Sequence, residues 1–171
     1  MASLIEDLID TLDNENKEYT KLLDLSMQKT AVIVKGDIKK LREIVAKEQL
    51  IVDDINILEK KREEGLDDIS NVLNIPNEEL TLKRLIEIMN KQPKEHAALI
   101  KVHDELKATV DNMVKINDNN KMLLQQSLDM VEFELNLAKN AMMAPETANY
   151  SKDAFNTTTQ NPTAGSFDAK Q

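Results

Sequence analysis

The sequence contains no cysteine and no tryptophan, and its 171 residues include only three glycines and four prolines. Without cysteine the chain has no disulfide, no thiolate metal site and no cysteine nucleophile. With so few glycines and prolines, it lacks the residues that a fold with many tight turns would use. It also lacks any run of 18 uninterrupted apolar residues, so no membrane-spanning segment is expected.

The chain is instead rich in charged and aliphatic residues. Charged residues make up 31% of it and hydrophobic residues 41%, while aromatic residues make up only 3%, which is typical of long helices and coiled coils. The net charge of −9 disfavours binding to nucleic acid and to anionic membranes. The N-terminal stretch MASLIEDLIDTLDNE is amphipathic and acidic, unlike a signal peptide, so we expect a cytoplasmic protein without direct membrane insertion.

A first helix is expected to end at the sequence VKGDI. Ser3 and Glu6 match a capping box at its start. Gly36 suits the left-handed position after a helix, and Asp37 suits the N-cap of the next one. The apolar stripe that keeps a helical period along this segment consists of Ile5, Leu8, Leu12, Tyr19, Leu22, Met27 and Ile33.

A second helix is expected over residues 38–73. Asn74-Ile75-Pro76 ends it, because proline disfavours helical angles in the residue before it. Gly65 inside this segment indicates either a close helix contact or a bend. The predicted core-facing stripe consists of Ile38, Leu41, Val45, Val52, Ile55, Leu66, Ile69 and Leu73, interrupted by Glu48, Glu59 and Arg62.

A short helix starting near Thr81 and a long helix over residues 93–143 complete the predicted fold. Pro93 suits the first turn of the long helix, which would measure roughly 75 Å if straight. Its stripe runs through Leu99, Leu106, Val110, Met113, Leu124, Leu128, Val131 and Leu135, with Asn117 and Asn120 in the middle, where asparagine can fix helix register. We therefore predict an all-α fold: an antiparallel bundle or coiled coil of three long helices with a short connecting helix in residues 1–144, and a flexible tail in residues 145–171.

The segment from Leu123 to Met143 carries two apolar stripes. One lies within about 40° of Leu124 on a helical wheel and consists of Leu124, Leu128, Val131, Leu135, Ala138 and Met142; we assign it to the bundle core. The other lies roughly 100–180° away and consists of Leu123, Met130, Phe133, Leu137 and Ala141. We interpret this second stripe as a surface for a partner helix. Burial on two sides of one helix, or a homodimer, would also explain it.

The chain shows no pattern typical of a catalytic centre. His96 and His103 lie seven residues apart, which separates them by roughly 10 Å along a helix, too far to bind one metal ion together. The carboxylates alternate with lysines, as in EKKREE, which is typical of a solvated helix face. No glutamate lies three residues before either histidine, and no phosphate-binding glycine loop is present. We expect no enzyme, no catalytic residue, no cofactor and no metal.

Three segments carry a resemblance to a known family. VKGDIKKLREIVAKEQLIVDDI resembles the first turn and second helix of the FlgN family of bacterial flagellar type III export chaperones. NNKMLLQQSLDMVEFELNL resembles that family's last helix, and SFDAKQ is similar to the end of some members. The resemblance covers most of residues 1–144. It implies a cytoplasmic chaperone that binds the C-terminal helical region of the first and third hook-associated (hook–filament junction) proteins, prevents their premature assembly and delivers them to the export gate.

The resemblance places the client-binding site on the last helix, and the stripe geometry selects the residues. They are Leu123, Met130, Phe133, Leu137, Ala141 and, at the edge, Met142. The resemblance also implies docking on the cytoplasmic domain of the export-gate membrane protein through a tail tyrosine followed four residues later by glycine. Tyr150 matches, but Ala154 stands where the glycine is expected, so Phe155 and Phe167 are alternatives. A structural coiled-coil adaptor or a self-associating helical bundle is the alternative function.

Overall fold

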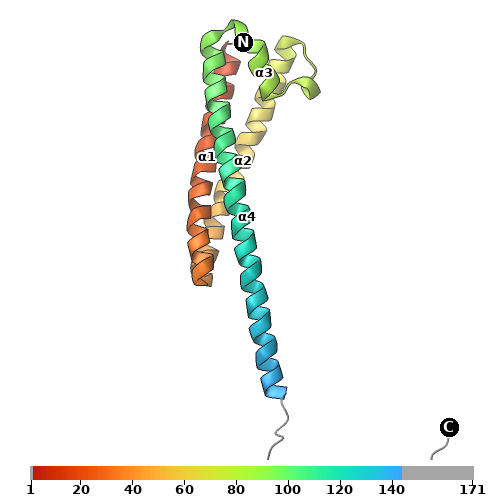
Figure 1. The fold of residues 1–171 in the computed structure, drawn as a ribbon. Helices are drawn as coiled ribbons and strands as arrows, with labels where there is room; N and C mark the ends of the chain where they lie inside the picture. Colours follow the sequence, from red (N-terminus) through yellow and green to blue (C-terminus); the bar gives the residue numbers. More distant parts are fainter. Residues whose placement is uncertain (1, 144–171) are drawn as a thin grey trace, which may run out of the picture. The chain divides into compact units, whose positions relative to one another are not determined.

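The computed structural model describes residues 2–143, and every regular element in that range is a helix. The elements are α1 (Ala2–Lys35), α2 (Ile38–Leu73), the 3-10 helix η1 (Asn77–Glu79), α3 (Leu82–Ile88), the 3-10 helix η2 (Met89–Lys91) and α4 (Pro93–Met143) (Figure 1). The all-α prediction is confirmed. The chain divides into two units, Met1–Glu132 and Phe133–Gln171, which are described separately. The predicted boundary between a bundle at 1–144 and a tail at 145–171 lies outside the described residues and stays a prediction.

The turn between α1 and α2 forms as the sequence predicts. Gly36 has φ +67°, the left-handed conformation that favours glycine. The Asp37 side chain accepts a hydrogen bond of 3.0 Å from the backbone N–H of Lys40, which caps α2. The predicted capping box at Ser3 is wrong, because α1 already includes Ala2 and Ser3 therefore lies inside the helix rather than at its N-cap.

The remaining helix ends are also set by local chemistry. Asn74 adopts φ +55° at the end of α2, and its N–H donates to the carbonyls of Asn71 and Ser70. Thr81 caps α3 by accepting a 3.2 Å bond from the N–H of Arg84. Pro93 is the first residue of α4. These predicted boundaries are confirmed.

The first unit is a bundle in which α1 and α2 pack closely as an antiparallel pair and α4 runs parallel to α1 (Figure 1). Its core joins four helices, because side chains from α1, α2, α3 and α4 meet in one cluster. The buried members are Ile5, Leu8, Leu12, Ile69, Leu80, Leu85, Met89, Leu99, Val102 and Leu106. The core therefore lies at the end of the bundle where α3 sits, as Figure 1 shows.

The predicted core-facing stripe of α2 is wrong near the start of the helix. Ile38 is 59% exposed and Val45 is 49% exposed, whereas the neighbouring Ile44 is only 8% exposed. The reason is that α2 meets α1 through Ile44 and Glu48, which lie four residues apart on one face. Met27 of α1 was also expected to face the core and is exposed.

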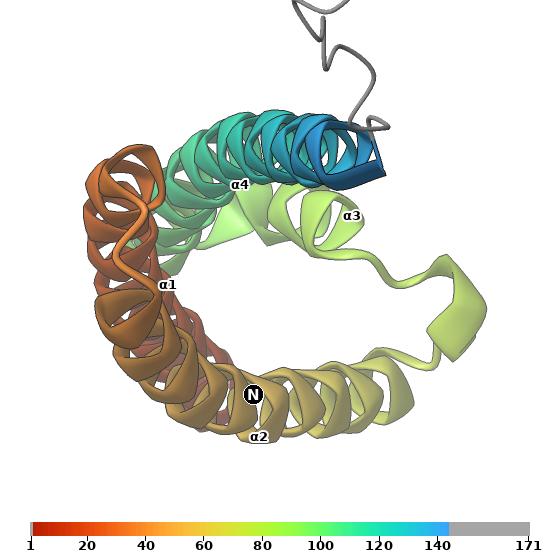
Figure 2. The ribbon, with the colours of Figure 1, turned by 90° about the horizontal axis from the view of Figure 1, so that it is seen from below.

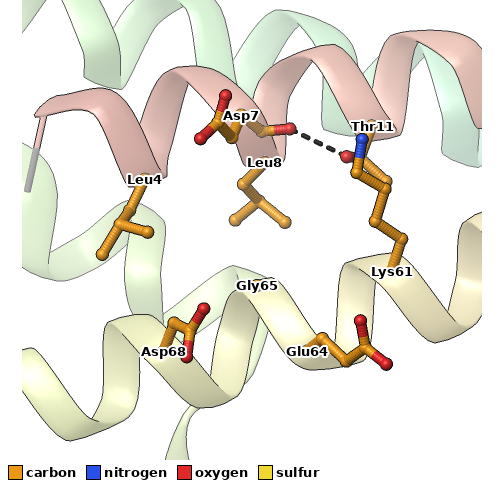
Figure 3. Close-up of a pocket in the computed structure, with 8 residues that line it drawn as sticks. All are labelled: Leu4, Asp7, Leu8, Thr11, Lys61, Glu64, Gly65 and Asp68. Atoms are coloured by element: carbon orange, nitrogen blue, oxygen red, sulfur yellow. Dashed lines mark hydrogen bonds between the residues drawn. The ribbon is translucent and has the colours of Figure 1, made fainter.

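Gly65 of α2 faces Leu8 of α1. It lines a surface hollow together with Leu4, Asp7, Leu8, Thr11, Lys61, Glu64 and Asp68 (Figure 3). A Cβ atom added at Gly65 would lie 3.8 Å from Cδ1 of Leu8, an ordinary van der Waals distance. Because a Cβ atom would fit there, the packing of α1 against α2 does not itself require glycine at this position.

Replacing Gly65 with alanine is expected to stabilise the protein. Alanine favours a helix interior by about 0.8–1 kcal/mol over glycine, and the added methyl group meets no clash. The measurement is the free energy of unfolding from urea titration. A variant such as Gly36→Ala, placed where φ is positive, should instead lose stability. A loss of stability in Gly65→Ala would show that the hollow must stay open.

Candidate functional site

The apolar face of α4 that packs on α1 continues past the point where α1 ends. Leu124 is half-buried, but Leu128 is 62% and Val131 is 52% exposed. Thr30 of α1 is bonded to Asn120 of α4, and α1 ends five residues after Thr30, so α4 beyond about residue 125 has no α1 beside it. The assignment of this stripe to the bundle core is therefore wrong from Leu128 onward. In the second unit, its members Leu135, Ala138 and Met142 are exposed as well.

The residues predicted to bind a client lie on other faces of the same helix. In the first unit, Leu123 is half-buried and Met130 is 64% exposed. In the second unit, Phe133 and Leu137 are 66% and 61% exposed, and Ala141 is exposed. Nine of the eighteen large hydrophobic side chains that are exposed among the described residues fall between Met122 and Met143. This concentration is far above the scattered exposure that a folded surface normally shows.

A buried polar layer fixes where α4 lies against α1 and α2. The amide of Asn120 donates a 2.8 Å bond to the backbone oxygen of Ser26, and the Thr30 hydroxyl donates a 2.6 Å bond to the Asn120 side-chain oxygen. The Ser26 hydroxyl donates to Glu48 at 3.0 Å, and the Lys29 ammonium lies 2.7 Å from the same carboxylate. The layer thus links all three long helices, through charge-assisted bonds to Glu48 between α1 and α2 and through neutral bonds between α1 and α4.

The sequence indicated only part of this layer. Asn117 and Asn120 stand in the predicted stripe of α4, and the structure gives both a partner, since Ser26 also lies within hydrogen-bond distance of Asn117 at 3.3 Å. Glu48 was taken as an interruption of the stripe of α2, whereas it is buried and bonded. One signal in the sequence could have revealed the burial of Glu48. It is a single carboxylate in an apolar stripe, with a serine and a lysine on the neighbouring helix.

A second buried carboxylate lies nearer the core. Glu15 of α1 is almost fully buried, and its side chain lies 3.7 Å from the guanidinium of Arg62. Burial raises the pKa of Glu15, and the Arg62 charge opposes that shift without cancelling it. Tyr19 donates a 3.2 Å bond to Glu59, and burial together with the Glu59 charge raises the pKa of Tyr19 to about 12.

Glu15 should make the protein less stable at neutral pH than under mildly acidic conditions. Because its pKa is higher in the folded chain, the stability that it contributes is present below its ordinary pKa of 4.5 and is lost as pH rises through the folded value. Glu15→Gln should remove this loss, so that the free energy of unfolding changes less between mildly acidic and neutral pH than in the unaltered protein. Urea titrations of both proteins at several pH values measure it. Glu6→Gln, on the exposed surface, is the control and should change the free energy of unfolding at pH 7 by less than about 0.5 kcal/mol.

The two histidines lie apart from any cluster of ligands. His96 is half-buried, and the Nδ1 atom of His103 lies 3.0 Å from a carboxylate oxygen of Asp104. Within residues 2–143, no group of three His, Cys, Asp or Glu side chains is placed to hold a metal ion. No helix in that same range is both long and apolar enough to cross a membrane. Tyr150, Phe155 and Phe167 lie outside the described residues, so the docking prediction for them stays a prediction.

The comparison with known families matches the resemblance seen in the sequence. The family model described as FlgN protein matches residues 1–158. No curated protein and no solved structure matches the chain. The match covers the helices α1 to α4 and two of the three segments that carry the resemblance, whereas SFDAKQ lies outside the matched residues. The chain therefore belongs to the FlgN family of flagellar export chaperones.

Proposed function

We propose that this protein is a cytoplasmic chaperone of the hook–filament junction proteins. It binds the C-terminal helical region of the first and third hook-associated proteins, keeps that region from assembling too early, and delivers it to the type III export gate. The observation that supports this proposal most strongly is the concentration of exposed apolar side chains at the C-terminal end of α4. The family membership supports the general role of a flagellar export chaperone.

The client helix is proposed to lie along the stripe Leu123, Met130, Phe133, Leu137 and Ala141, with Met142 at its edge. The spacings of seven, three, four and four residues are those of an amphipathic helix-in-groove contact. Methionine and phenylalanine give this stripe large, adaptable side chains that suit more than one client. The polar side of α4, roughly 90–130° around the helix from the centre of this stripe, carries Gln125, Asp129 and Asn136, which would stay in water.

The energetics suit a reversible carrier. Burying five or six such side chains contributes on the order of 5–10 kcal/mol before costs. The entropic costs of ordering two helices and of losing free motion cancel most of this favourable free energy. The remaining affinity is in the micromolar range or somewhat tighter. A complex of this strength covers the coiled-coil stripe of an unassembled client and still releases it at the gate.

Delivery is proposed to use Tyr150 as the docking residue for the cytoplasmic domain of the export-gate membrane protein. Ala154 in place of the glycine of the family motif makes Phe155 and Phe167 competing candidates. A carrier that holds client and gate at the same time would need a different segment for each, and these aromatic residues follow α4 in the chain.

Titration calorimetry with a synthetic C-terminal peptide of a hook-associated protein tests the proposal directly. The expected result is one-to-one binding by the full-length protein with micromolar affinity or tighter. Absence of binding, together with concentration-dependent self-association in sedimentation, would favour the self-associating bundle instead. In that case a homodimer would cover the exposed stripe.

A further inference from the structure

Methionine is the only sulfur-containing residue type in this chain, and half of its methionines lie in one segment. The sequence has eight methionines and no cysteine. Four of the eight, Met122, Met130, Met142 and Met143, lie in the C-terminal part of α4. An oxidant that attacks sulfur therefore meets only thioethers in this protein, and half of them are in the segment proposed to bind the client.

The structure separates protected methionines from accessible ones. Met89 is 4% exposed, because it follows α3, which lies inside the curve that α1, α2 and the start of α4 form (Figure 2). In the first unit, Met122 is 53% and Met130 is 64% exposed. In the second unit, Met142 and Met143 are 87% and 80% exposed. A small oxidant reaches these four side chains in the folded protein, whereas it reaches Met89 only when the core opens.

Met130 lies at the centre of the stripe proposed to bind the client. At 100° per residue, Leu123 and Phe133 lie within about 60° of it around α4. Met122 lies about 80° away from Met130 and Met142 about 120° away, so both are nearer the edges of the stripe. Among these methionines, Met130 is therefore the one that a helix bound along the stripe would cover most completely.

Oxidation would change Met130 from an apolar to a polar side chain. The sulfoxide carries an oxygen atom that accepts hydrogen bonds. In the free protein the exposed side chain keeps this oxygen in water, so oxidation should leave α4 folded. Under a bound apolar helix the oxygen would lose its water, and a buried acceptor without a donor weakens binding.

The side chains around Met130 are poorly suited to compensate for this loss. Leu123 and Phe133 have no hydrogen-bond donor, and the Ser127 hydroxyl already donates to the backbone oxygen of Leu123 at 2.9 Å. Gln126, one turn before Met130, has an amide that can donate. Turning this amide over Met130 would fill the space that the apolar side chains of a client need, so the apolar contact would be lost in either case.

We propose that Met130 is a reversible oxidation site whose sulfoxide switches client binding off. The oxidant is hydrogen peroxide. The sulfur lone pair attacks one peroxide oxygen, the O–O bond breaks, and the hydroxide that leaves takes the proton of the transferred oxygen, which gives sulfoxide and water. Sulfur loses two electrons and peroxide gains them. A methionine sulfoxide reductase with a dithiol as electron donor reverses the change and releases the oxygen as water. The proposal rests on the proposed function, because it concerns regulation of the same site.

Peroxide treatment of the full-length protein tests the proposal. Catalase removes the peroxide before an untreated hook-associated C-terminal peptide is added. Mass spectrometry should show that Met130 is oxidised at least about tenfold faster than Met89. Titration calorimetry should show that the oxidised protein binds the peptide at least about tenfold more weakly than the untreated protein. The reductases for both sulfoxide epimers, with dithiothreitol, should restore the affinity to within about twofold.

Three variants separate Met130 from the other methionines. Met130→Leu keeps an apolar side chain without sulfur, so its affinity after oxidation should stay within about twofold of its own affinity before oxidation. Met27→Leu is the matched control, because Met27 is an exposed methionine of α1 outside the stripe, and this variant should show the full loss upon oxidation. Met130→Gln places a polar side chain where the sulfoxide would be and should bind weakly without any oxidant.

Several outcomes would overturn the proposal. They are oxidation of Met130 no faster than that of Met89, unchanged binding once Met130 is oxidised, and equal losses in Met130→Leu and the unaltered protein. A loss of helix content in circular dichroism upon oxidation would also overturn it, because weaker binding would then reflect unfolding. If the untreated protein does not bind the peptide, the proposed function fails and the switch fails with it. Binding that is present before oxidation and unaltered after it refutes the switch alone.

Discussion

The double variant Met130→Asp/Phe133→Asp is expected to bind a hook-associated C-terminal peptide at least about 100-fold more weakly than the unaltered protein. Both side chains are more than half exposed, so their replacement removes little packing within the chain. Each would be a central apolar anchor under a bound helix, where an aspartate would be buried without a partner. Titration calorimetry measures the affinity, and circular dichroism should show unchanged helix content.

A matched control adds the same charge elsewhere on α4. Gln125→Glu/Asn136→Asp places two carboxylates on the polar side of the helix and should alter the affinity by less than about threefold. Equal loss in both variants would mean that added charge, rather than lost apolar contact, weakens binding. If Met130→Asp/Phe133→Asp unfolds the protein or only separates a dimer, the stripe is a core or an oligomer interface, and the client site proposed for it is wrong.

Asn120→Ala is expected to lower the free energy of unfolding by about 2–3 kcal/mol. The Asn120 side chain is 2% exposed and takes part in two hydrogen bonds, one with the Thr30 hydroxyl and one with the Ser26 carbonyl. Alanine would leave the Thr30 hydroxyl without its side-chain acceptor and would open a small void between α1 and α4. Urea titration followed by circular dichroism measures the change.

Asn112→Ala is the control for this effect. Asn112 lies on the exposed side of the same helix, and alanine there should change stability by no more than about 0.5 kcal/mol, towards greater stability because of its helix propensity. If Asn120→Ala changes the free energy of unfolding by no more than Asn112→Ala does, then the polar layer does not hold α4 against α1. The position of α4 would in that case depend on the apolar core near α3 alone.

The helix boundaries could be predicted because each depends on a few neighbouring residues. Gly36 with Asp37, Thr81 and Pro93 act through backbone angles and caps within one turn of chain, and the structure places each as expected. Which face of a helix is buried depends also on which other elements of the fold pack against it. Periodicity shows that Val45 and Leu128 belong to apolar stripes, but it does not show which other element reaches them. Both lie where no other described helix covers them, so the prediction of burial was wrong.

The candidate site could be narrowed to α4 because the sequence has more apolar positions there than one packed face needs. The choice of Met130, Phe133 and Leu137 over Leu128 and Val131 rested on the idea that the second group faces the core. Since the structure exposes both groups, the apolar surface of α4 is wider than the one stripe that was selected. Long-range geometry, namely the residue at which α1 ends, decides this, and no local pattern in α4 encodes it.

The polar layer and the length of α1 together determine how much of α4 is not covered by α1. The side-chain amide of Asn120 finds its hydrogen-bond partners only beside Ser26 and Thr30. If α4 moved along α1 by one helical turn, about 5.4 Å, this buried amide would lose those partners. Relatives could therefore enlarge or shrink the uncovered surface without touching α4. Adding or deleting turns between Thr30 and Gly36 would be sufficient, which makes the hairpin tip of α1 and α2 the place to look for differences in client size.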